Sequence, residues 1–152
     1  MPVGRSLRLL ALAGLAILAA CAQTPPAPLK LTILHTNDVH SRLQMVNAFG
    51  SNCSAQEAQQ NRCLGGVARI ATLFETNRAE ALAAGRQVLI LNGGDNFQGS
   101  LFYTHYKGAA ELEVNNMLGY DAMAIGNHEF DDGPANLSRY LRGAKFPVLS
   151  AN

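Results

Sequence analysis

The chain has 152 residues, of which 48% are hydrophobic and 15% are charged. This length allows one domain at most, and the composition excludes a disordered or polar-tract chain. The formal net charge of +1 excludes a strongly basic nucleic-acid binder, so we expect no nucleic-acid polymer as a partner.

The N-terminus predicts a bacterial lipoprotein signal peptide over residues 1–20. A positively charged start precedes an apolar run that ends at Ala20 and is too short to span a bilayer, which takes about 20 residues. A short buried helix is the alternative. The run ends in LAAC, which resembles the lipobox of bacterial lipoproteins. The resemblance implies acylation of Cys21 and a lipid anchor, and Ala22 after it implies the outer membrane, facing the periplasm or the cell surface.

Residues 21–28 contain three prolines and predict an extended tether. Strand and helix patterns alternate after it, over residues 29–152. Apolar runs predict strands over residues 29–36, 88–91, 122–125 and 146–151. Helical spacing of apolar residues predicts helices over residues 67–84, 109–118 and 134–141.

This alternation predicts an α/β fold with a parallel sheet and helices on its faces. The continuous apolar run over residues 88–91 predicts a strand that is buried on both faces. The chain stops at Asn152, directly after a predicted strand with no covering element, so we expect a truncated chain.

Polar side chains follow three of the strands, and sites in parallel α/β sheets form at such carboxyl ends. Asp38 and His40 follow the first, Asp95 follows the second, and Asn127 and His128 follow the third. In extended backbone, Asp38 and His40 would point the same way. Mixed oxygen and imidazole ligands favour Mn²⁺, Zn²⁺ or Fe. Each motif alone is more often a turn, but together they predict a metal site.

The segments ILHTNDVHSRL, LNGGDNFQGS and AIGNHEFDDG resemble the first three metal motifs of the calcineurin-like metallophosphoesterases. The longer stretch from LGGVARI to KFPVLSAN resembles one branch, the 5′-nucleotidases. The resemblance implies a four-layer α/β/β/α metallophosphoesterase domain, of which this chain holds an incomplete N-terminal part. It also implies a separate C-terminal nucleotide-binding domain that is absent here.

The resemblance also implies the roles of the site residues around two divalent metal ions, Zn, Mn or similar. Asp38 and His40 would bind the first ion, Asp95 would bridge both, and Asn127 would bind the second. His128 would be the catalytic histidine, with Asp131 as its partner. The substrate-binding residues are not implied by this part of the chain, and the oligomeric state is left open.

Other polar residues near these motifs receive structural interpretations. Glu129 is expected to support its loop without a chemical role, and Asp132 is expected to be a solvated acid. His35 is interpreted as structural, and His105 as a surface or packing histidine.

Cys53 and Cys63 lie in a polar loop, and in an exported protein two such cysteines predict a disulfide. The eukaryotic members of the family, which have a paired cysteine before GGVAR, support this interpretation. A thiolate metal site is the alternative, although the loop has neither a CxxC motif nor a nearby histidine.

The family hydrolyses nucleotides outside the cytoplasm, which predicts a nucleotide substrate and a role in nucleotide catabolism. One alternative is a sister enzyme of the superfamily, either a 2′,3′-cyclic nucleotide phosphodiesterase/3′-nucleotidase or a thiosulfohydrolase. Another is a non-catalytic, metal-binding surface lipoprotein. The further family ligands, a histidine and a Gly-His-x-His segment, are not found in residues 1–152. We therefore expect this fragment alone to be inactive.

Overall fold

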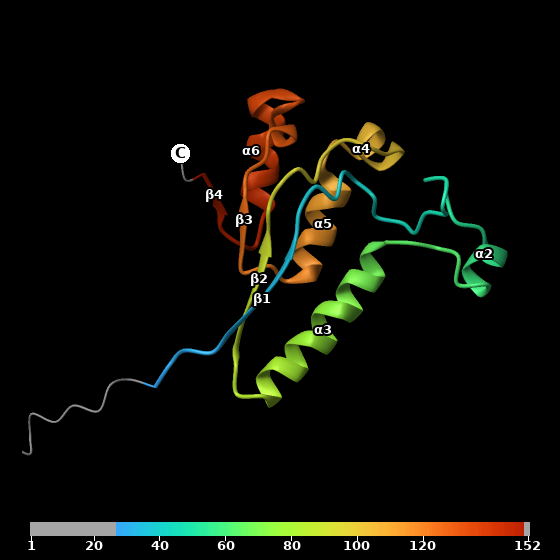
Figure 1. Ribbon diagram of the computed structural model, residues 1–152. Coiled ribbons are helices and arrows are strands. Elements are labelled where there is room, and N and C mark those ends of the chain that lie inside the picture. The colour runs from blue at the N-terminus through green and yellow to red at the C-terminus, as the bar shows by residue number, and fades with distance from the viewer. Residues whose placement is uncertain (1–26, 151–152) are drawn as a thin grey trace, which may run out of the picture.

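Four parallel strands form the centre of the computed structural model, which describes residues 27–150 (Figure 1). The sheet order is β1-β2-β3-β4, the same as the order along the chain. The strands are β1 (Leu31–Thr36), β2 (Gln87–Asn92), β3 (Ala122–Ala124) and β4 (Val148–Leu149). The predicted α/β class with a parallel sheet is confirmed, and the four-layer arrangement stays a prediction.

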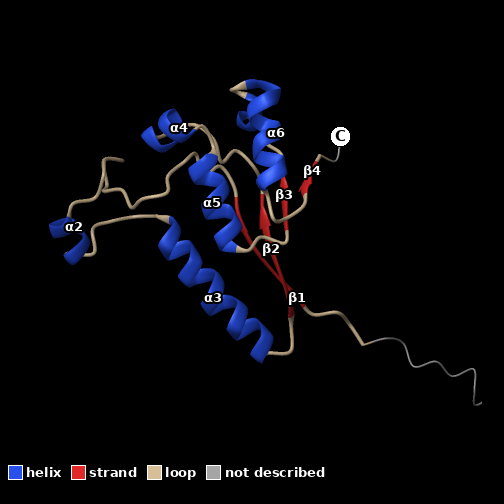
Figure 2. Cartoon of the chain, turned by 180° about the vertical axis from the view of Figure 1, so that it is seen from behind, coloured by secondary structure: helices blue, strands red, loops and turns tan. Residues whose placement is uncertain are grey.

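The connections between the strands carry the helices. These are α2 (Ala55–Gln59), α3 (Val67–Ala83), α4 (Leu101–Tyr106), α5 (Ala109–Leu118), the 3₁₀ helix η1 (His128–Phe130) and α6 (Gly133–Gly143). Parallel crossovers are right-handed, and here every crossover moves in the same direction along the sheet. The helices therefore cover one face, and Figure 2 shows α3 and α5 together on that side.

The core lies between that face of the sheet and the helices. Ile90 and Met123 point into it from the sheet, and the aromatic rings of Phe97, Tyr103 and Tyr140 pack with them. Such burial of apolar surface is the main force that holds the helices on the sheet.

The other face of the sheet is open among the described residues. Leu89 of β2 is 38% exposed and Ile33 of β1 is 53% exposed. The prediction that residues 88–91 are buried on both faces is therefore wrong for this part of the chain, because no crossover places a helix there. His35 also lies on β1 and is exposed.

The longest predicted elements agree with the structure. The predicted helix over residues 67–84 is α3, and the helix over 109–118 is α5, which ends at Gly119 in a left-handed cap. The predicted strand over residues 146–151 is shorter, since β4 covers only Val148–Leu149 within the described residues.

Residues 1–26 are outside the described part of the chain, and so are the predicted signal peptide, Cys21 and most of the tether. Within residues 27–150, no helix has both the length and the apolar character needed to cross a membrane.

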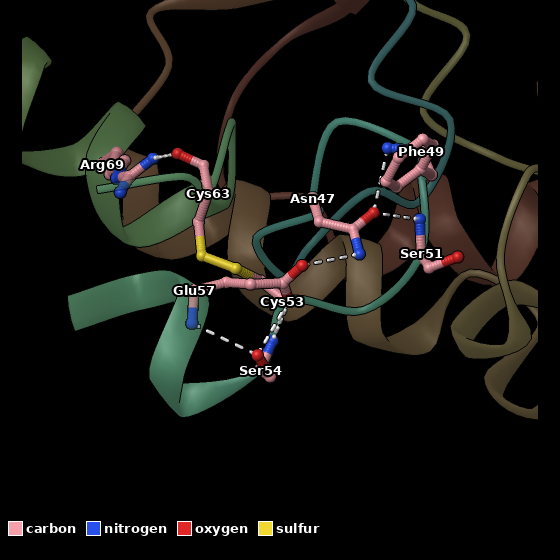
Figure 3. Close-up of a disulfide and its surroundings, with 8 residues drawn as sticks. All are labelled: Asn47, Phe49, Ser51, Cys53, Ser54, Glu57, Cys63 and Arg69. Carbon is pink, nitrogen blue, oxygen red and sulfur yellow. Dashed lines mark hydrogen bonds between the residues drawn. A yellow bond between two sulfur atoms is a disulfide. The ribbon is translucent and has the colours of Figure 1, made fainter. Parts of the chain in front are cut away.

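A disulfide joins Cys53 to Cys63 across the loop before α3, with their Cα atoms 5.8 Å apart (Figure 3). The loop between them contains α2, which begins at a capping box between Ser54 and Glu57. The Arg69 guanidinium of α3 donates to the carbonyl of Cys63. The disulfide and this contact hold the loop against the first turn of α3.

Candidate metal centre

The loop after β1 is joined to the loop after β2 by three backbone hydrogen bonds. Asp38 N donates to Gly94 O at 3.0 Å, and His40 N donates to Asp95 O at 3.1 Å. Ser41 N donates to Asn96 O at 2.8 Å. Parallel neighbours with the same register deliver both loops to the same edge of the sheet, so these bonds continue the pairing of β1 with β2.

Three of the predicted site residues have left-handed backbone. The φ angles are 53° at Asp38, 47° at His40 and 53° at Asp95. The expected extended backbone from Asp38 to His40 is therefore wrong, because β1 ends at Thr36 and the chain then turns. The two side chains approach each other nevertheless, with His40 Nε2 3.8 Å from Asp38 Oδ1. Left-handed backbone is unfavourable for residues other than glycine, and functional sites are where it concentrates.

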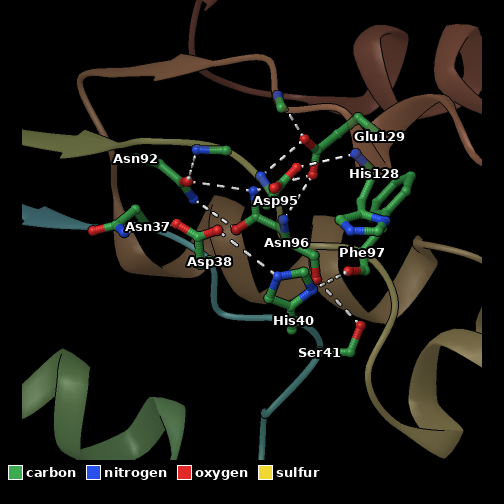
Figure 4. Close-up of polar contacts among 12 residues, drawn as sticks. Asn37, Asp38, His40, Ser41, Asn92, Asp95, Asn96, Phe97, His128 and Glu129 are labelled. Atoms are coloured by element: carbon green, nitrogen blue, oxygen red, sulfur yellow. Dashed lines mark hydrogen bonds and ion pairs between the residues drawn. The ribbon is translucent and has the colours of Figure 1, made fainter.

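Three of the predicted site residues form a compact cluster (Figure 4). His40, Asp95 and His128 each offer one ligand atom, and these atoms all lie within 4.8 Å of one another. The two imidazole rings meet edge to face, with centroids 5.0 Å apart. One residue comes from the carboxyl end of each of the first three strands, as the sheet topology predicts.

A hydrogen bond determines which nitrogen of His40 is available. His40 Nδ1 lies 3.1 Å from the carbonyl oxygen of Phe97, and a carbonyl can only accept, so Nδ1 carries the hydrogen. In the neutral ring Nε2 then holds the lone pair, and this is the atom nearest Asp38. Such support of the second nitrogen is typical of histidines that bind metal ions.

His128 is oriented by Asp131. His128 Nδ1 donates to Asp131 Oδ2 at 2.7 Å, so Nε2 faces away from that carboxylate. The hydrogen bond that His128 donates to Asp131 raises the pKa of His128 above its ordinary value, and it lowers the pKa of Asp131. The structure thus brings this predicted pair into direct contact.

Asn127 begins η1 directly before His128, and its side chain is exposed. It shares the strand end with His128, but none of the described contacts ties its amide to the cluster of His40, Asp95 and His128. Its predicted role as a ligand of the second ion stays a prediction.

Asp132 is exposed, as its interpretation as a solvated acid predicts, but it also has two side-chain partners. Its carboxylate accepts a hydrogen bond from Tyr103 Oη at 2.6 Å and lies 3.4 Å from Lys107 Nζ. The Tyr103 hydrogen bond lowers the pKa of Asp132. The acid therefore connects the start of α6 to α4. His105, in the same helix, is exposed, as expected.

Two buried amides beneath the site, Asn92 and Asn96, were not predicted from the sequence. Asn92 Nδ2 donates to Asn96 Oδ1 at 2.8 Å, and Asn92 Oδ1 accepts from Gly94 N at 2.9 Å. Both side chains are buried. Their position on either side of Gly93-Gly94-Asp95 is the signal that would have found them, because buried amides beside a turn usually hold its backbone.

The donor set fits a divalent cation. The ligand atoms of His40 and Asp95 converge beside the His128 ring, and the tautomer of His40 presents a free lone pair to the same space. Imidazole and carboxylate ligands together suit Zn²⁺ or Mn²⁺. Asp38 can add a second carboxylate at the edge of this group.

The fold and the site define an α/β protein with a cluster of candidate metal ligands at the carboxyl ends of its strands. Residues 31–151 match the calcineurin-like phosphoesterase family, and the chain belongs to that family.

Similar proteins and solved structures agree with this family assignment. The chain is 49% identical over 142 residues to a 5′-nucleotidase of Bos taurus, covering 91% of this chain and 23% of the relative. A 5′-nucleotidase precursor from Thermus thermophilus superimposes with a TM-score of 0.64 at 42% identity, covering 80% of this chain and 22% of that one. The chain thus spans about a fifth of the length of these relatives.

A sulfate thiohydrolase from Thermus thermophilus superimposes with a TM-score of 0.67 at 18% identity, covering 86% of this chain and 31% of that one. This likeness shows the shared fold only.

Proposed function

We propose that the protein is a metal-dependent phosphoester hydrolase that releases phosphate from nucleoside 5′-phosphates. The observation that carries the proposal is the cluster of His40, Asp95 and His128, each at a strand end of a family member. The 5′-nucleotidase relative that is 49% identical to this chain supports the nucleotide substrate.

Two divalent ions, Zn, Mn or similar, are part of the proposal. Asp38 and His40 would hold the first ion, Asp95 would serve both, and Asn127 would hold the second. The 3.8 Å approach of His40 to Asp38 supports their joint action. A bridging carboxylate at Asp95 offsets the mutual repulsion of two close cations.

His128 and Asp131 act on the phosphate. Bound ions of this type activate water and polarise phosphate oxygens. His128 Nε2 faces the same space as His40 and Asp95, so it can donate a hydrogen bond to a phosphate oxygen there. Asp131 holds the ring in position and favours its charged form. The charge that develops on the phosphate in the transition state is thereby stabilised.

The proposed location is outside the cytoplasm. The signal-like residues 1–20 and the lipobox-like LAAC support export and anchoring through Cys21, with residues 21–28 as a tether to the domain from residue 29 on. The outer membrane is the proposed site of the anchor, and the protein would act there in nucleotide catabolism.

The experiment starts from the membrane fraction of cells that express the protein as its gene encodes it. Adenosine 5′-monophosphate is supplied, and released phosphate is measured before and after removal of metal by a chelator and readdition of Mn²⁺ or Zn²⁺. We expect turnover that the chelator abolishes and the metal restores. His128→Asn should lower kcat by about 10²- to 10⁴-fold, the range for loss of a positioned proton donor.

His105→Asn is the matched control, because His105 is an exposed histidine of α4 outside the cluster. Its kcat should equal that of the unsubstituted protein. Hydrolysis of 2′,3′-cyclic or 3′-nucleotides, or of a thiosulfate ester, in place of the 5′-monophosphate would contradict the substrate and favour a sister activity. Metal binding without any hydrolysis would favour a non-catalytic lipoprotein.

A further inference from the structure

Glu129 is completely buried, at 0% exposure, one position after His128. None of the ion pairs among the described residues includes it. A buried carboxylate without a cation is very unfavourable unless hydrogen bonds compensate for its lost hydration. Hydrogen-bond donors around the Glu129 carboxylate provide this compensation.

These donors are mainly backbone N–H groups from two different loops (Figure 4). Glu129 Oε2 accepts from Asp95 N at 3.0 Å and from Gly126 N at 2.8 Å. Glu129 Oε1 accepts from Asn96 N at 2.7 Å, and Asn96 Nδ2 lies 3.4 Å away. One side chain thus fastens the loop after β2 to the loop after β3.

The contact between the loops is reciprocal. While Glu129 accepts from the backbone of Asp95, Asp95 Oδ1 accepts from the backbone N–H of His128 at 3.0 Å. A Cβ atom added to Gly126 would collide with the Asp95 carboxylate, so the two loops are in close contact at this point. The left-handed backbone of Asp95 is therefore held from both sides.

We propose that Glu129 is a positioning residue that sets the orientation of the Asp95 carboxylate for metal binding. This proposal rests on the proposed function, in which Asp95 is a metal ligand. Glu129 itself is not a metal ligand in this proposal. Its carboxylate acts by receiving the N–H groups of Asp95 and Asn96, which fixes the turn from which the Asp95 side chain projects.

Glu129→Gln is the sharpest variant because it keeps the size and shape of the side chain. Both carboxylate oxygens accept hydrogen bonds, but an amide has only one oxygen. The amide NH₂ must face a backbone N–H, whichever way the group is turned. The turn at Asp95 should relax, and the affinity for metal should fall by about 10- to 100-fold, as for other residues that orient metal ligands.

Glu111→Gln is the matched control. Glu111 is also buried, at 1% exposure, but its carboxylate oxygens have no hydrogen-bond partner among the described residues. The two substitutions therefore make the same chemical change in a buried side chain, and only Glu129 accepts hydrogen bonds from the loops of the site.

The test measures Mn²⁺ binding by calorimetry to the complete metal-free protein, and amide hydrogen exchange at Asp95, Asn96 and Gly126. In the unsubstituted protein these amides should exchange slowly without any metal, because Glu129 is their acceptor. Glu129→Gln should accelerate their exchange at least tenfold and weaken Mn²⁺ binding by the stated factor. Glu111→Gln should change neither.

Each other outcome is decisive. Fast exchange of these amides in the unsubstituted protein overturns the proposal, even if Glu129→Gln does not fold. Equal Mn²⁺ affinity in Glu129→Gln and the unsubstituted protein overturns it while the proposed function stands. Mn²⁺ binding that depends on Glu129, without phosphoester hydrolysis, supports the positioning role and overturns the proposed function. An unsubstituted protein that binds no Mn²⁺ overturns both.

Discussion

Single residues at the site occupy the left-handed backbone region, which is uncommon for residues other than glycine. Asp38, His40 and Asp95 are all left-handed, although none is a glycine. Residues in this region cost free energy and persist only where the surroundings hold them. Here the hydrogen bonds from Asp38 N and His40 N to the next loop do so. These hydrogen bonds between the two loops therefore contribute to the arrangement of the site residues.

Gly126 lies so close to Asp95 that no side chain can be added at this position. A Cβ there would meet the Asp95 carboxylate and backbone, although the φ angle of Gly126 is not in the left-handed region. We expect Gly126→Ala to lower the free energy of unfolding by about 1–3 kcal/mol, as overpacking does, and to weaken Mn²⁺ binding more than tenfold. Urea unfolding and calorimetry measure the two effects.

Gly85→Ala is the control for that variant. Gly85 is left-handed and follows α3, and an added Cβ would meet no atom within 4 Å. Gly85→Ala should lower the free energy of unfolding only because alanine is strained in left-handed backbone, and it should bind Mn²⁺ with unchanged affinity. Normal metal affinity in Gly126→Ala would show that the close contact with Asp95 is not needed for the site.

The residue types of the site were predictable, but their geometry was not. Asp38, His40, Asp95 and His128 stood out because each follows a predicted strand. Their left-handed turns depend on hydrogen bonds between loops far apart in the sequence, such as His40 N to Asp95 O. No local pattern encodes such a bond.

At the scale of elements, the contact of α4 with the start of α6 depends on Asp132. Tyr103 donates to this carboxylate at 2.6 Å. The pKa of Asp132 is lowered by this hydrogen bond and by Lys107, while Asp131 opposes the shift. A carboxyl group whose pKa is lower in the folded state stabilises the protein when the pH is above its unfolded-state pKa of about 3.9. This stabilisation is lost as the pH falls through the lower, folded-state pKa.

Tyr103→Phe should therefore lower the stability of the metal-free protein near neutral pH. The difference from the unsubstituted protein should shrink as the pH falls below about 4, because Asp132 then becomes protonated. Urea unfolding along a pH series measures it. Tyr106→Phe, at a half-exposed tyrosine of the same helix, should have little effect at any pH. A constant difference between Tyr103→Phe and the unsubstituted protein across the series would contradict the role of the Asp132 charge.

Helices were predicted correctly where the repeat of apolar residues was long. α3 and α5 have several turns, so their apolar residues repeat often enough to be recognised. α2 and α4 were not predicted, because they are 5 and 6 residues long and too short to show a period. Side-chain caps at Ser54 and Ser100 start them instead.

At the scale of the whole molecule, helices cover only one face of the sheet among residues 27–150. The open face carries Ile33, Leu89 and Leu149, each more than a third exposed. Burial on both faces was expected from the apolar run of β2, since such runs are typical of covered parallel strands. Which face a helix covers depends on the direction of each crossover, and composition does not contain that information.

Residues 21–152 produced alone should hydrolyse no nucleotide above a blank that contains metal only. The described residues bring three ligand atoms into one cluster, whereas a site for two ions needs ligands for both. Phosphate release from adenosine 5′-monophosphate, with Mn²⁺ in both samples, measures this. Turnover by this polypeptide would show that the cluster and its loops suffice for catalysis.

The strand order has a consequence for how the chain acquires its structure. Because the order in the sheet equals the order in the chain, each new strand joins the free edge left by the previous one, and none must be inserted between two neighbours already in place. A polypeptide that emerges from its N-terminus, from a ribosome or through a translocation pore, can assemble this sheet as it arrives. The segment with His128 and Glu129 arrives after β3, so it is the last part of the described site to emerge.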